Sequence, residues 1–222
     1  MKSTRTIWAS SREAHIVGRA LCPDACYRAL VAAGIEGVAE VTPGSHTVQI
    51  RVKEDADPES TLAGVRSIVQ HENIAPSCCP DCVVEIPICS DPDLAPDLEA
   101  VARNAGLSPD AAADLHATGE YTIRFLGFSP GFPYIDGLPD SLHVPRLDTP
   151  RPRVRAGSVG IAGSRTGIYP YPSPGGWNLI GATPLRLFDT SRDQPALLAP
   201  GDRIRFRRIE RVEFEALETD EA

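Results

Sequence analysis

The stretch SVGIAGSRTGIYPYPSPGGWNLIGATP, residues 158–184, contains three short strand-like runs separated by Gly, Pro and Ser. Runs of this kind predict β-strands joined by tight turns. The runs LRLFD and DRIRFRRI continue the pattern toward the C-terminus. Residues 127–201 hold 12 of the 21 prolines and 11 of the 18 glycines. This composition favours a β-barrel or sandwich over a parallel α/β sheet.

Residues 14–88 follow a different pattern, in which strands and helices alternate. A strand is expected at AHIVGRA, a helix from Pro23 and Asp24, and a hairpin from GVAEV and TVQIRV. A second helix is expected from Asp57 and Pro58, and VVEIPI would then supply a closing strand. The resulting order, βαββαβ, is that of a ferredoxin-like unit.

The change of pattern predicts an α+β protein with two domains. Residues 1–82 would form an N-terminal ferredoxin-like α/β domain, and residues 83–222 a C-terminal β-barrel domain. Two short helices, APDLEAVARNAG and SPDAAADLHA, and the strand YTIRFLGF would open the second domain. The acidic tail EFEALETDEA is expected to be a frayed end.

Charge and composition narrow the classes of partner. The chain of 222 residues carries a net charge of −8 and has a pI of about 5.1, which argues against binding to nucleic acid or to an anionic membrane. Small molecules and proteins are therefore the expected partners. The first 20 residues lack the apolar segment of a signal peptide, so a cytoplasmic location is expected.

The segment LGFSPGFPY, residues 126–134, contains the G-x-S-x-G spacing of a serine hydrolase elbow. The residue after Ser129 is Pro130, which has no N–H to donate to an oxyanion. The only downstream histidine, His143, lies in a proline-rich run. We therefore reject a hydrolase triad and expect Ser129→Ala to leave activity within a few-fold of wild type.

Two Gly- and Pro-rich loops are candidates for a binding site, because rigid loops position ligand-binding groups. The first is LGFSPGFPY and the second is TGIYPYPSPGGW. Packed turns at a barrel corner are the alternative interpretation. The candidate substrate-binding residues in these loops are Phe128, Pro130, Gly131, Phe132, Tyr134, Thr166, Tyr169, Pro170, Ser173, Gly175, Gly176 and Trp177.

Two charged features add to this set. Arg151, Arg153 and Arg155 alternate in RPRVRAG, so guanidiniums would project from one side of an extended segment. A carboxylate, a phosphate, an acidic partner surface or solvent would each suit them, and Arg151 joins the candidate substrate-binding residues. His116 falls at the end of a predicted helix, where the helix dipole favours the protonated imidazole.

The six cysteines are expected to be reduced in a cytoplasmic protein. Cys22 and Cys26 stand as C-x₃-C, and Cys79 and Cys82 as C-x₂-C. Both pairs would lie at one end of the predicted N-terminal sheet, so a single tetrahedral zinc site is one hypothesis and unliganded thiols are the other.

The second half of the chain resembles a known family in four segments: LGFSPGFPYIDGLPDSL, TPRPRVRAGSVGIAGSRTGIYP, SPGGWNLIGATPLRLFD and LLAPGDRIRF. They are similar to the family of the 5-oxoprolinase B subunit, also called allophanate hydrolase subunit 1 or KipI, which is half of a carboxyltransferase-like module. The resemblance covers residues 83 to about 209. It implies a cyclophilin-like β-barrel preceded by a smaller α/β domain.

The resemblance also implies a function: the B subunit of an ATP-dependent 5-oxoprolinase, which converts 5-oxoproline to glutamate together with a homologous C subunit and an A subunit. It implies that His116 is a candidate catalytic or substrate-orienting group. No phosphate loop is present, so the other subunits would handle ATP, and the chain alone would be inactive. The strand DRIRFRRI is expected to be a sheet edge that a homologous partner covers.

Two other functions are compatible with the same loops. A KipI-like inhibitor of a sporulation histidine kinase and a urea- or allophanate-type carboxyltransferase subunit share these loops, so both remain open. Prolyl isomerase activity is rejected, since the isomerase's arginine and aromatic residues do not map onto this sequence.

Overall fold

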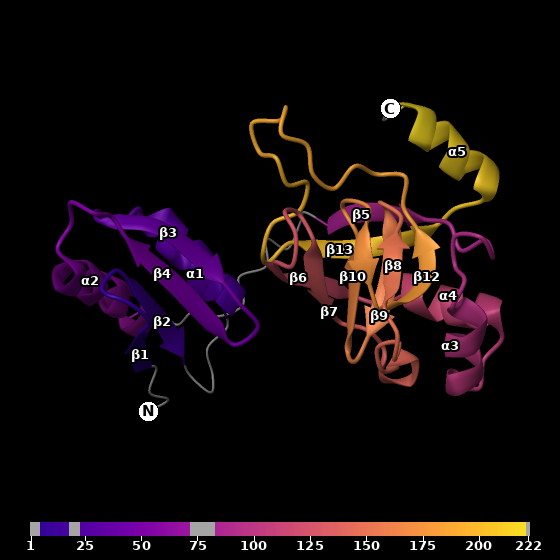
Figure 1. Cartoon of the computed structure of the whole chain (residues 1–222), viewed down its shortest axis with the longest axis horizontal. Helices are drawn as coiled ribbons and strands as arrows, with labels where there is room; N and C mark the ends of the chain where they lie inside the picture. Colours follow the sequence, from indigo (N-terminus) through magenta and orange to yellow (C-terminus); the bar gives the residue numbers. More distant parts are fainter. Residues whose placement is uncertain (1–4, 18–22, 72–82, 221–222) are drawn as a thin grey trace. The chain divides into compact units, whose positions relative to one another are not determined.

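The computed structural model describes residues 5–17, 23–71 and 83–220. The chain divides into two compact units, Met1–Cys79 and Pro80–Ala222, shown in Figure 1. The domain boundary that the sequence predicts, between residues 82 and 83, falls at the end of a segment outside the described residues.

The first unit contains a four-stranded antiparallel sheet in the order β1-β2-β4-β3. The strands are β1 (Arg5–Trp8), β2 (Glu13–Val17), β3 (Val38–Pro43) and β4 (Thr47–Val52). The helices α1 (Pro23–Ala33) and α2 (Pro58–His71) begin at the prolines that predicted them. Alternate residues of β2 and β4 are buried with residues of the two helices, and this core consists of Ala14, Ile16, Cys26, Leu30, Val48, Ile50, Leu62 and Val65.

The predicted βαββαβ order is wrong in this unit. The segment VVEIPI forms β5 (Val83–Ile88), which pairs in parallel with β13 (Arg203–Arg208) of the second unit over six residue pairs. The edge beside β2 belongs instead to β1, a four-residue strand that the sequence pattern did not predict. Both VVEIPI and RTIW suit a strand locally, and their partners are decided by contacts distant in sequence.

The second unit is built on a seven-stranded sheet in the order β12-β9-β10-β7-β6-β13-β5. Its other strands are β6 (Tyr121–Leu126), β7 (Pro133–Asp136), β9 (Ser158–Ala162), β10 (Arg165–Ile168) and β12 (Asn178–Ala182). Beyond β5, Cys89 and Ala182 exchange two backbone hydrogen bonds of 2.9 Å, which join the two edges of the sheet. The sheet is therefore a nearly closed barrel, and the α+β prediction with a C-terminal barrel is confirmed.

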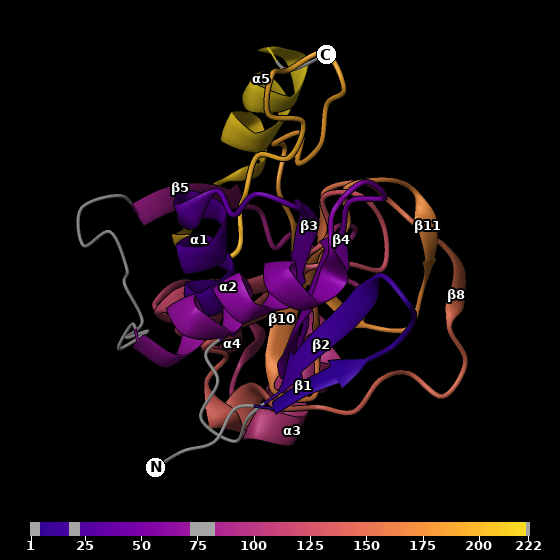
Figure 2. The ribbon, with the colours of Figure 1, turned by 90° about the vertical axis from the view of Figure 1, so that its left-hand side faces the viewer.

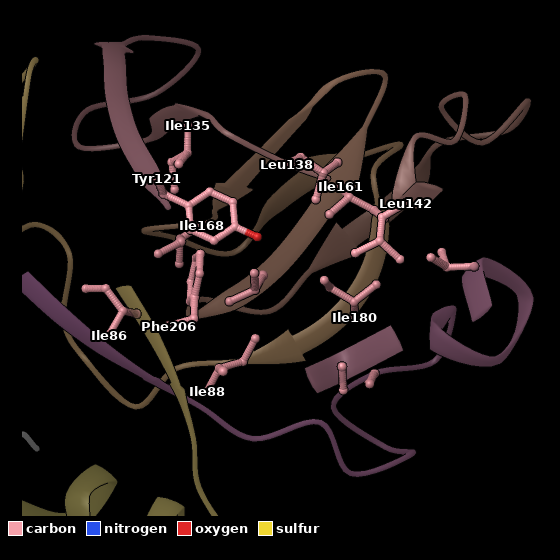
Figure 3. Close-up of a cluster of buried hydrophobic side chains, with 14 of the residues drawn as sticks. Ile86, Ile88, Tyr121, Ile135, Leu138, Leu142, Ile161, Ile168, Ile180 and Phe206 are labelled. Carbon is pink, nitrogen blue, oxygen red and sulfur yellow. The ribbon is translucent and has the colours of Figure 1, made fainter. Parts of the chain in front are cut away.

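Inside the barrel lies a mainly aliphatic cluster that we call the barrel core. Figure 3 shows Ile88, Ile161, Ile168 and Ile180, from four different strands, directed into it. The predicted helices α3 (Leu98–Ala105) and α4 (Pro109–Ala117) contribute to the same core. Ser108 caps α4 by accepting the Ala111 N–H at 3.2 Å.

The expectation that DRIRFRRI forms a partner-covered edge is wrong. This segment is β13, which lies between β6 and β5 within the sheet. Ile204 and Phe206 are buried in the barrel core. Their alternation with arginines reflects the inner and outer faces of a barrel strand.

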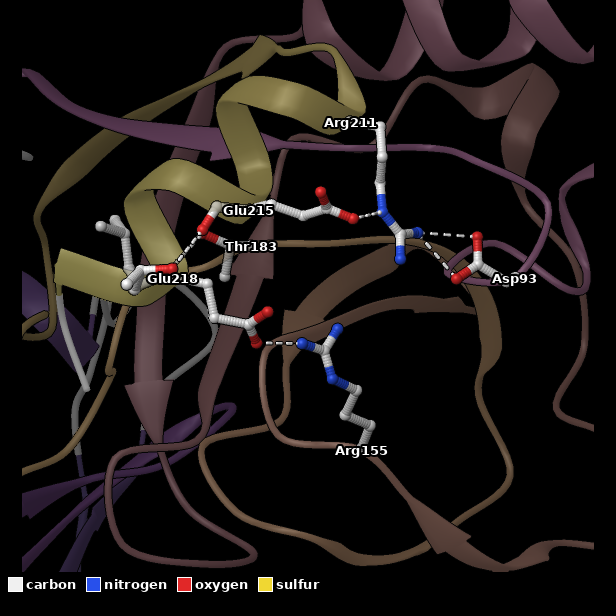
Figure 4. A network of polar contacts seen from close by, with 8 residues as sticks. Asp93, Arg155, Thr183, Arg211, Glu215 and Glu218 are labelled. Carbon is white, nitrogen blue, oxygen red and sulfur yellow. Dashed lines mark hydrogen bonds and ion pairs between the residues drawn. The ribbon is translucent and has the colours of Figure 1, made fainter.

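The C-terminal tail is also different from the prediction, because residues 211–220 form the helix α5 (Arg211–Asp220). Phe214 is buried with Cys89, Leu94, Ala182 and Ile209 beside the barrel closure. Figure 4 shows that Arg211 pairs with Asp93 and Glu215, and that Arg155 pairs with Glu218. These contacts hold the helix against the barrel unit.

A two-stranded ribbon completes the second unit. It pairs β8 (Arg151–Val154) with β11 (Ser173–Gly175), and Figure 2 shows the two strands side by side. A short 3₁₀ helix, η1 (Asp140–Leu142), precedes it.

The predicted strand LRLFD is not formed, and only an isolated bridge joins Phe188 to Ala196. Among the described helices, none is both long and apolar enough to span a membrane.

Candidate functional site

The two predicted loops meet in a second buried cluster, which we call the aromatic cluster. It consists of Phe132, Val154, Ala162, Tyr169, Trp177 and Leu179, with Tyr134 packed against it. Leu179 and Ala162 are sequence neighbours of Ile180 and Ile161, which belong to the barrel core. Because neighbouring strand residues point to opposite faces, the aromatic cluster lies on the other face of the barrel strands. Val154 of the ribbon joins the cluster, so the ribbon packs over that face.

Glycine backbone brings the rings close to the sheet and to the ribbon. A Cβ atom at Gly167 would lie 3.0 Å from Phe132 Cζ and from Trp177 Cζ3. A Cβ atom at Gly175 would lie 2.3 Å from the Tyr169 hydroxyl. The rings therefore pack directly on main chain, which only glycine permits.

The loop at residues 127–132 presents one aromatic side chain to solvent. Gly127 N–H donates to the Phe132 carbonyl at 3.1 Å, and Phe132 N–H donates to the Ser129 carbonyl at 3.0 Å. Phe128 has φ 68°, and its side chain is 64% exposed. A bulky residue with positive φ is an energetically unfavourable conformation that clusters at functional sites. Its ring contacts Phe132 edge to face at 5.5 Å.

Ser129 lies in the same loop without the partners of a nucleophile. Its Oγ is buried, and no residue in the described part of the chain hydrogen-bonds it. His143 Nε2 instead bonds the Leu138 carbonyl at 3.1 Å. This arrangement agrees with the rejection of a hydrolase triad.

His116 is buried in contact with the barrel core. Its ring lies 4.5 Å from that of Phe206, and its Nε2 is 3.1 Å from the Thr166 hydroxyl. That hydroxyl donates to the Gly160 carbonyl at 3.1 Å, so Nε2 acts as the donor to Thr166.

Burial lowers the pKa of His116 to about 3. The expectation of a protonated imidazole is wrong, since desolvation outweighs the helix dipole. A role in catalysis stays a prediction.

The arginines of RPRVRAG do not form one surface. Arg151 pairs with Asp97 at 2.7 Å, whereas Arg155 pairs with Glu218 of α5 and lies over the Phe214 ring. Arg153 is exposed. The alternation applies only within β8, which ends at Val154.

Arg151 and the ribbon carry buried polar atoms near the aromatic cluster. Arg151 Nη1 and Ser173 Oγ are buried, and neither has a hydrogen-bond partner among the described residues. Burial raises the pKa of the Tyr169 phenol, while a hydrogen bond from the Trp177 backbone and the charges of Arg146 and Arg151 oppose that rise. The Arg146 guanidinium lies 5.9 Å from the Trp177 ring centre. Two arginines therefore lie near the rings at this margin, and one of them is paired with Asp97.

The predicted site residues fall into three groups. Phe132, Tyr134, Tyr169 and Trp177 meet in the aromatic cluster, and Phe128 contacts it. Thr166 is separate from it and joins His116. The others are placed around these groups: Pro130 is exposed, Gly131 and Pro170 are buried, Arg151, Ser173 and Gly175 belong to the ribbon, and the Gly176 carbonyl accepts the Leu147 N–H at 2.8 Å.

Asp97 is a polar residue at this margin that the sequence pattern did not single out. It stands before the helix α3, where its type predicts a cap, but its side chain makes no capping bond. Its carboxylate instead bonds Arg151 and the Leu179 N–H. The only sign of this role in the local sequence is that an acidic residue, Asp97, stands near the start of the predicted helix APDLEAVARNAG.

A separate hollow of about 520 Å³ lies where α4 ends against β13. Its lining is mixed in charge, and Arg208 there is paired with Asp110 and Asp114. None of the predicted site residues lines it.

The described residues contain no group of three or more side chains that suits a metal ion. Cys26 is buried, but the zinc hypothesis also depends on Cys22, Cys79 and Cys82, which lie outside the described residues.

Comparison with known proteins identifies relatives in sequence. The 5-oxoprolinase B subunit of Escherichia coli O157:H7 is 44% identical over 171 residues, which cover 76% of this chain and 77% of that protein. The protein of the same name from Bacillus subtilis (strain 168) is 48% identical over 134 residues, 60% of this chain. That match spans 56% of the Bacillus subtilis protein, or little more than half of its length.

Solved structures agree on the fold. The crystal structure of TTHA0988 has a TM-score of 0.75 at 35% identity, covering 90% of this chain and 40% of that chain. Urea carboxylase of Kluyveromyces lactis has a TM-score of 0.70, covering 99% of this chain and 23% of that chain. Its identity of 17% supports a likeness of fold alone.

A family model described as carboxyltransferase domain, subdomain C and D, matches residues 13–198. The chain therefore belongs to that family, and its relatives include proteins named as the B subunit of 5-oxoprolinase.

Proposed function

We propose that this chain is the B subunit of an ATP-dependent 5-oxoprolinase, which opens the lactam of 5-oxoproline to give glutamate. The observation that carries the proposal is the 44% identity to the Escherichia coli protein of that name over 77% of its length. A lactam is a resonance-stabilised amide with a poor leaving group. Phosphorylation of the lactam oxygen by ATP would let water add at the ring carbon. The C–N bond then breaks, with the amine leaving, to give an acyl phosphate, which a second water hydrolyses to glutamate and inorganic phosphate.

The chain would act as one part of a hetero-oligomer in the cytoplasm. Its sequence has no G-x-x-x-x-G-K-[ST] loop, and among the described residues Ser129 has no histidine partner suited to nucleophilic attack. The A subunit and the homologous C subunit would therefore bind ATP and provide the reacting groups. This chain would form one wall of a shared substrate site.

The margin of the aromatic cluster is the surface that suits this role. Phe128 and the half-buried Tyr134 provide apolar contact for a small ring, and Arg151 and Ser173 provide polar groups beside it. Trp177 and the His116–Thr166 hydrogen bond would hold the strands that carry these groups. A small-molecule site combines apolar walls with a few placed polar groups in this way.

The test is to purify the chain alone and with its two partner subunits, and to measure ATP-dependent glutamate release from 5-oxoproline. We expect activity only from the complete complex. Trp177→Ala and His116→Ala should lower activity, whereas Val212→Ala, at an exposed position on α5, should not. Full turnover by the isolated chain would contradict the shared site. A complete complex that releases no glutamate would contradict the substrate.

A urea-type carboxyltransferase subunit is the second candidate, because the chain has the fold of part of Kluyveromyces lactis urea carboxylase. The same complex should then be assayed with urea, ATP, bicarbonate and a biotin carboxylase. Carboxylated urea without any glutamate release would favour this candidate over the first.

A further inference from the structure

The residue Asp97 joins three separate elements of the barrel unit. Its N–H donates to the Leu179 carbonyl at 3.0 Å, and its Oδ2 accepts the Leu179 N–H at 2.7 Å. Its Oδ1 accepts a hydrogen bond from Arg151 Nη2 at 2.7 Å. Asp97 precedes α3, Leu179 belongs to β12, and Arg151 belongs to β8.

The bonds to Leu179 give Asp97 a defined orientation. The strand β12 is at one end of the sheet order, so its outer backbone groups need partners. Asp97 satisfies both groups of Leu179, one with its backbone and one with its carboxylate. The second carboxylate oxygen is thereby fixed in direction, and it fixes Nη2 of the guanidinium.

The other end of the same guanidinium is uncommitted. Arg151 Nη1 is shielded from solvent and has no hydrogen-bond partner in the ranges that the structure describes. Ser173 Oγ, on the partner strand of the ribbon, has none either. Buried donors of this kind are rare in folded proteins unless water or a ligand satisfies them. The free edge of a planar guanidinium suits a carboxylate.

We propose that Asp97 is a positioning residue, which orients Arg151 so that Nη1 binds the carboxylate of the substrate. This inference rests on the proposed function, in which the substrate is 5-oxoproline. It assigns the carboxylate end of that molecule to the ribbon. The lactam end is then left to face the groups that the partner subunits provide.

A purely structural ion pair would have a different consequence. Loss of such a pair weakens the fold and affects every substrate alike, whereas loss of a carboxylate-binding group affects only substrates that carry the carboxylate. The uncharged analogue of 5-oxoproline is 5-oxoprolinamide, which keeps the lactam ring and lacks the negative charge of the carboxylate. The ratio of kcat/KM for the acid and the amide therefore separates the two explanations.

The experiment uses the complete complex with Asp97→Asn or Arg151→Lys in this chain. In Asp97→Asn, the amide oxygen still accepts the Leu179 N–H, but the amide nitrogen faces the guanidinium. In Arg151→Lys, the positive charge stays, but the planar arrangement of several N–H donors is lost. The matched control is Glu218→Gln, which breaks the Arg155 ion pair just beyond the same strand.

We expect Asp97→Asn and Arg151→Lys to raise KM for 5-oxoproline roughly 10- to 100-fold while kcat changes less than about threefold. KM for the amide should hardly change, so the preference for the acid collapses. The double variant should be little worse than either single variant. Glu218→Gln should leave the preference unchanged. Equal losses for acid and amide, or a preserved preference in Asp97→Asn, would overturn the inference.

Binding of the two compounds to the same complexes, measured by calorimetry, separates this inference from the proposed function. A wild-type complex that releases no glutamate, yet binds the acid more tightly than the amide through Asp97 and Arg151, refutes only the reaction. A complex that turns over 5-oxoproline with an unchanged preference in both variants refutes only the carboxylate site. Absence of any preference for the acid in wild type also refutes the carboxylate site.

Discussion

The barrel core and the aromatic cluster lie on opposite faces of the same strands, and they differ in chemistry. The barrel core is largely aliphatic, whereas the aromatic cluster consists mainly of rings packed on glycine backbone. Near the aromatic cluster, Arg151 Nη1 and Ser173 Oγ are buried without partners in the described residues. Unpaired buried polar atoms lower stability. One face of the strands therefore carries an aliphatic core, and the other carries a buried ring cluster with unpaired polar atoms at its margin, where we propose a binding site.

The largest expected effect is on the barrel side. Ile161→Ala removes a fully buried side chain from the barrel core and should lower the free energy of unfolding by about 2–5 kcal/mol. The chain has two tryptophans, so a Trp8→Phe background leaves Trp177 as the sole fluorescence reporter of urea unfolding. Val212→Ala is the exposed control, expected within about 0.5 kcal/mol of wild type. A loss below about 1 kcal/mol for Ile161→Ala would contradict the division between the two faces.

The second prediction concerns pH. The pKa of His116 is about 3 in the folded protein, against 6.5 for an exposed imidazole, so the unfolded chain binds the proton first. The stability that depends on His116 is therefore complete above pH 6.5 and falls as pH drops toward 3, by up to about 1.4 kcal/mol per pH unit. Urea unfolding at pH 7, 6 and 5 should show this slope in wild type.

His116→Gln is the matched variant for the pH series. It lacks the titrating group, so its stability should depend less on pH between about 6.5 and 5, whatever its absolute value. Hydrogen-bonded ion pairs with arginines lower the pKa values of Asp93 and Glu213, so these carboxyls titrate at lower pH than the series covers. Equal slopes in both proteins would show that His116 does not remain neutral in the fold.

The third prediction tests the close packing of the aromatic cluster. Gly175→Ala places a Cβ atom 2.3 Å from the Tyr169 hydroxyl and should cost about 1–3 kcal/mol of stability. Tyr169→Phe removes that hydroxyl but leaves the ring carbon Cζ 2.7 Å from the added Cβ, so the double variant should recover only part of the loss. Gly176→Ala is the neighbouring control, since its nearest atoms lie 3.6 Å from the added Cβ. Similar losses at both glycines would contradict the packing.

The smallest expected effect has the opposite sign. Phe128→Gly removes an exposed side chain and relieves the positive φ, so stability should be unchanged or rise by up to about 1 kcal/mol. The activity of the complete complex should nevertheless fall, because the ring faces the proposed site. Phe128→Ala keeps the strained backbone and should lower activity without any gain in stability. A destabilised Phe128→Gly with full activity would assign this ring to the fold instead.

Local sequence determined where most helices and strands begin. The prolines at positions 23 and 58 start α1 and α2, and Gly34, with φ 55°, follows the end of α1, where glycine is common. Alternation identified β4, because a strand with one buried face carries that signal in its own residues. The Pro- and Gly-rich turns between short runs were enough to predict the barrel. Motifs in the same segments were enough to predict the family.

Tertiary structure alone decided which strands pair and which polar groups meet. VVEIPI and DRIRFRRI were both predicted as strands, but only the fold pairs them with each other inside the barrel. His116 was expected to be charged from its place on a helix, and the surrounding core makes it neutral. Asp97 and Arg151 are 54 residues apart, so no local pattern reveals their bond. Secondary structure follows from neighbouring residues, whereas strand partners, burial and ion pairs depend on contacts between segments that the folded chain brings together.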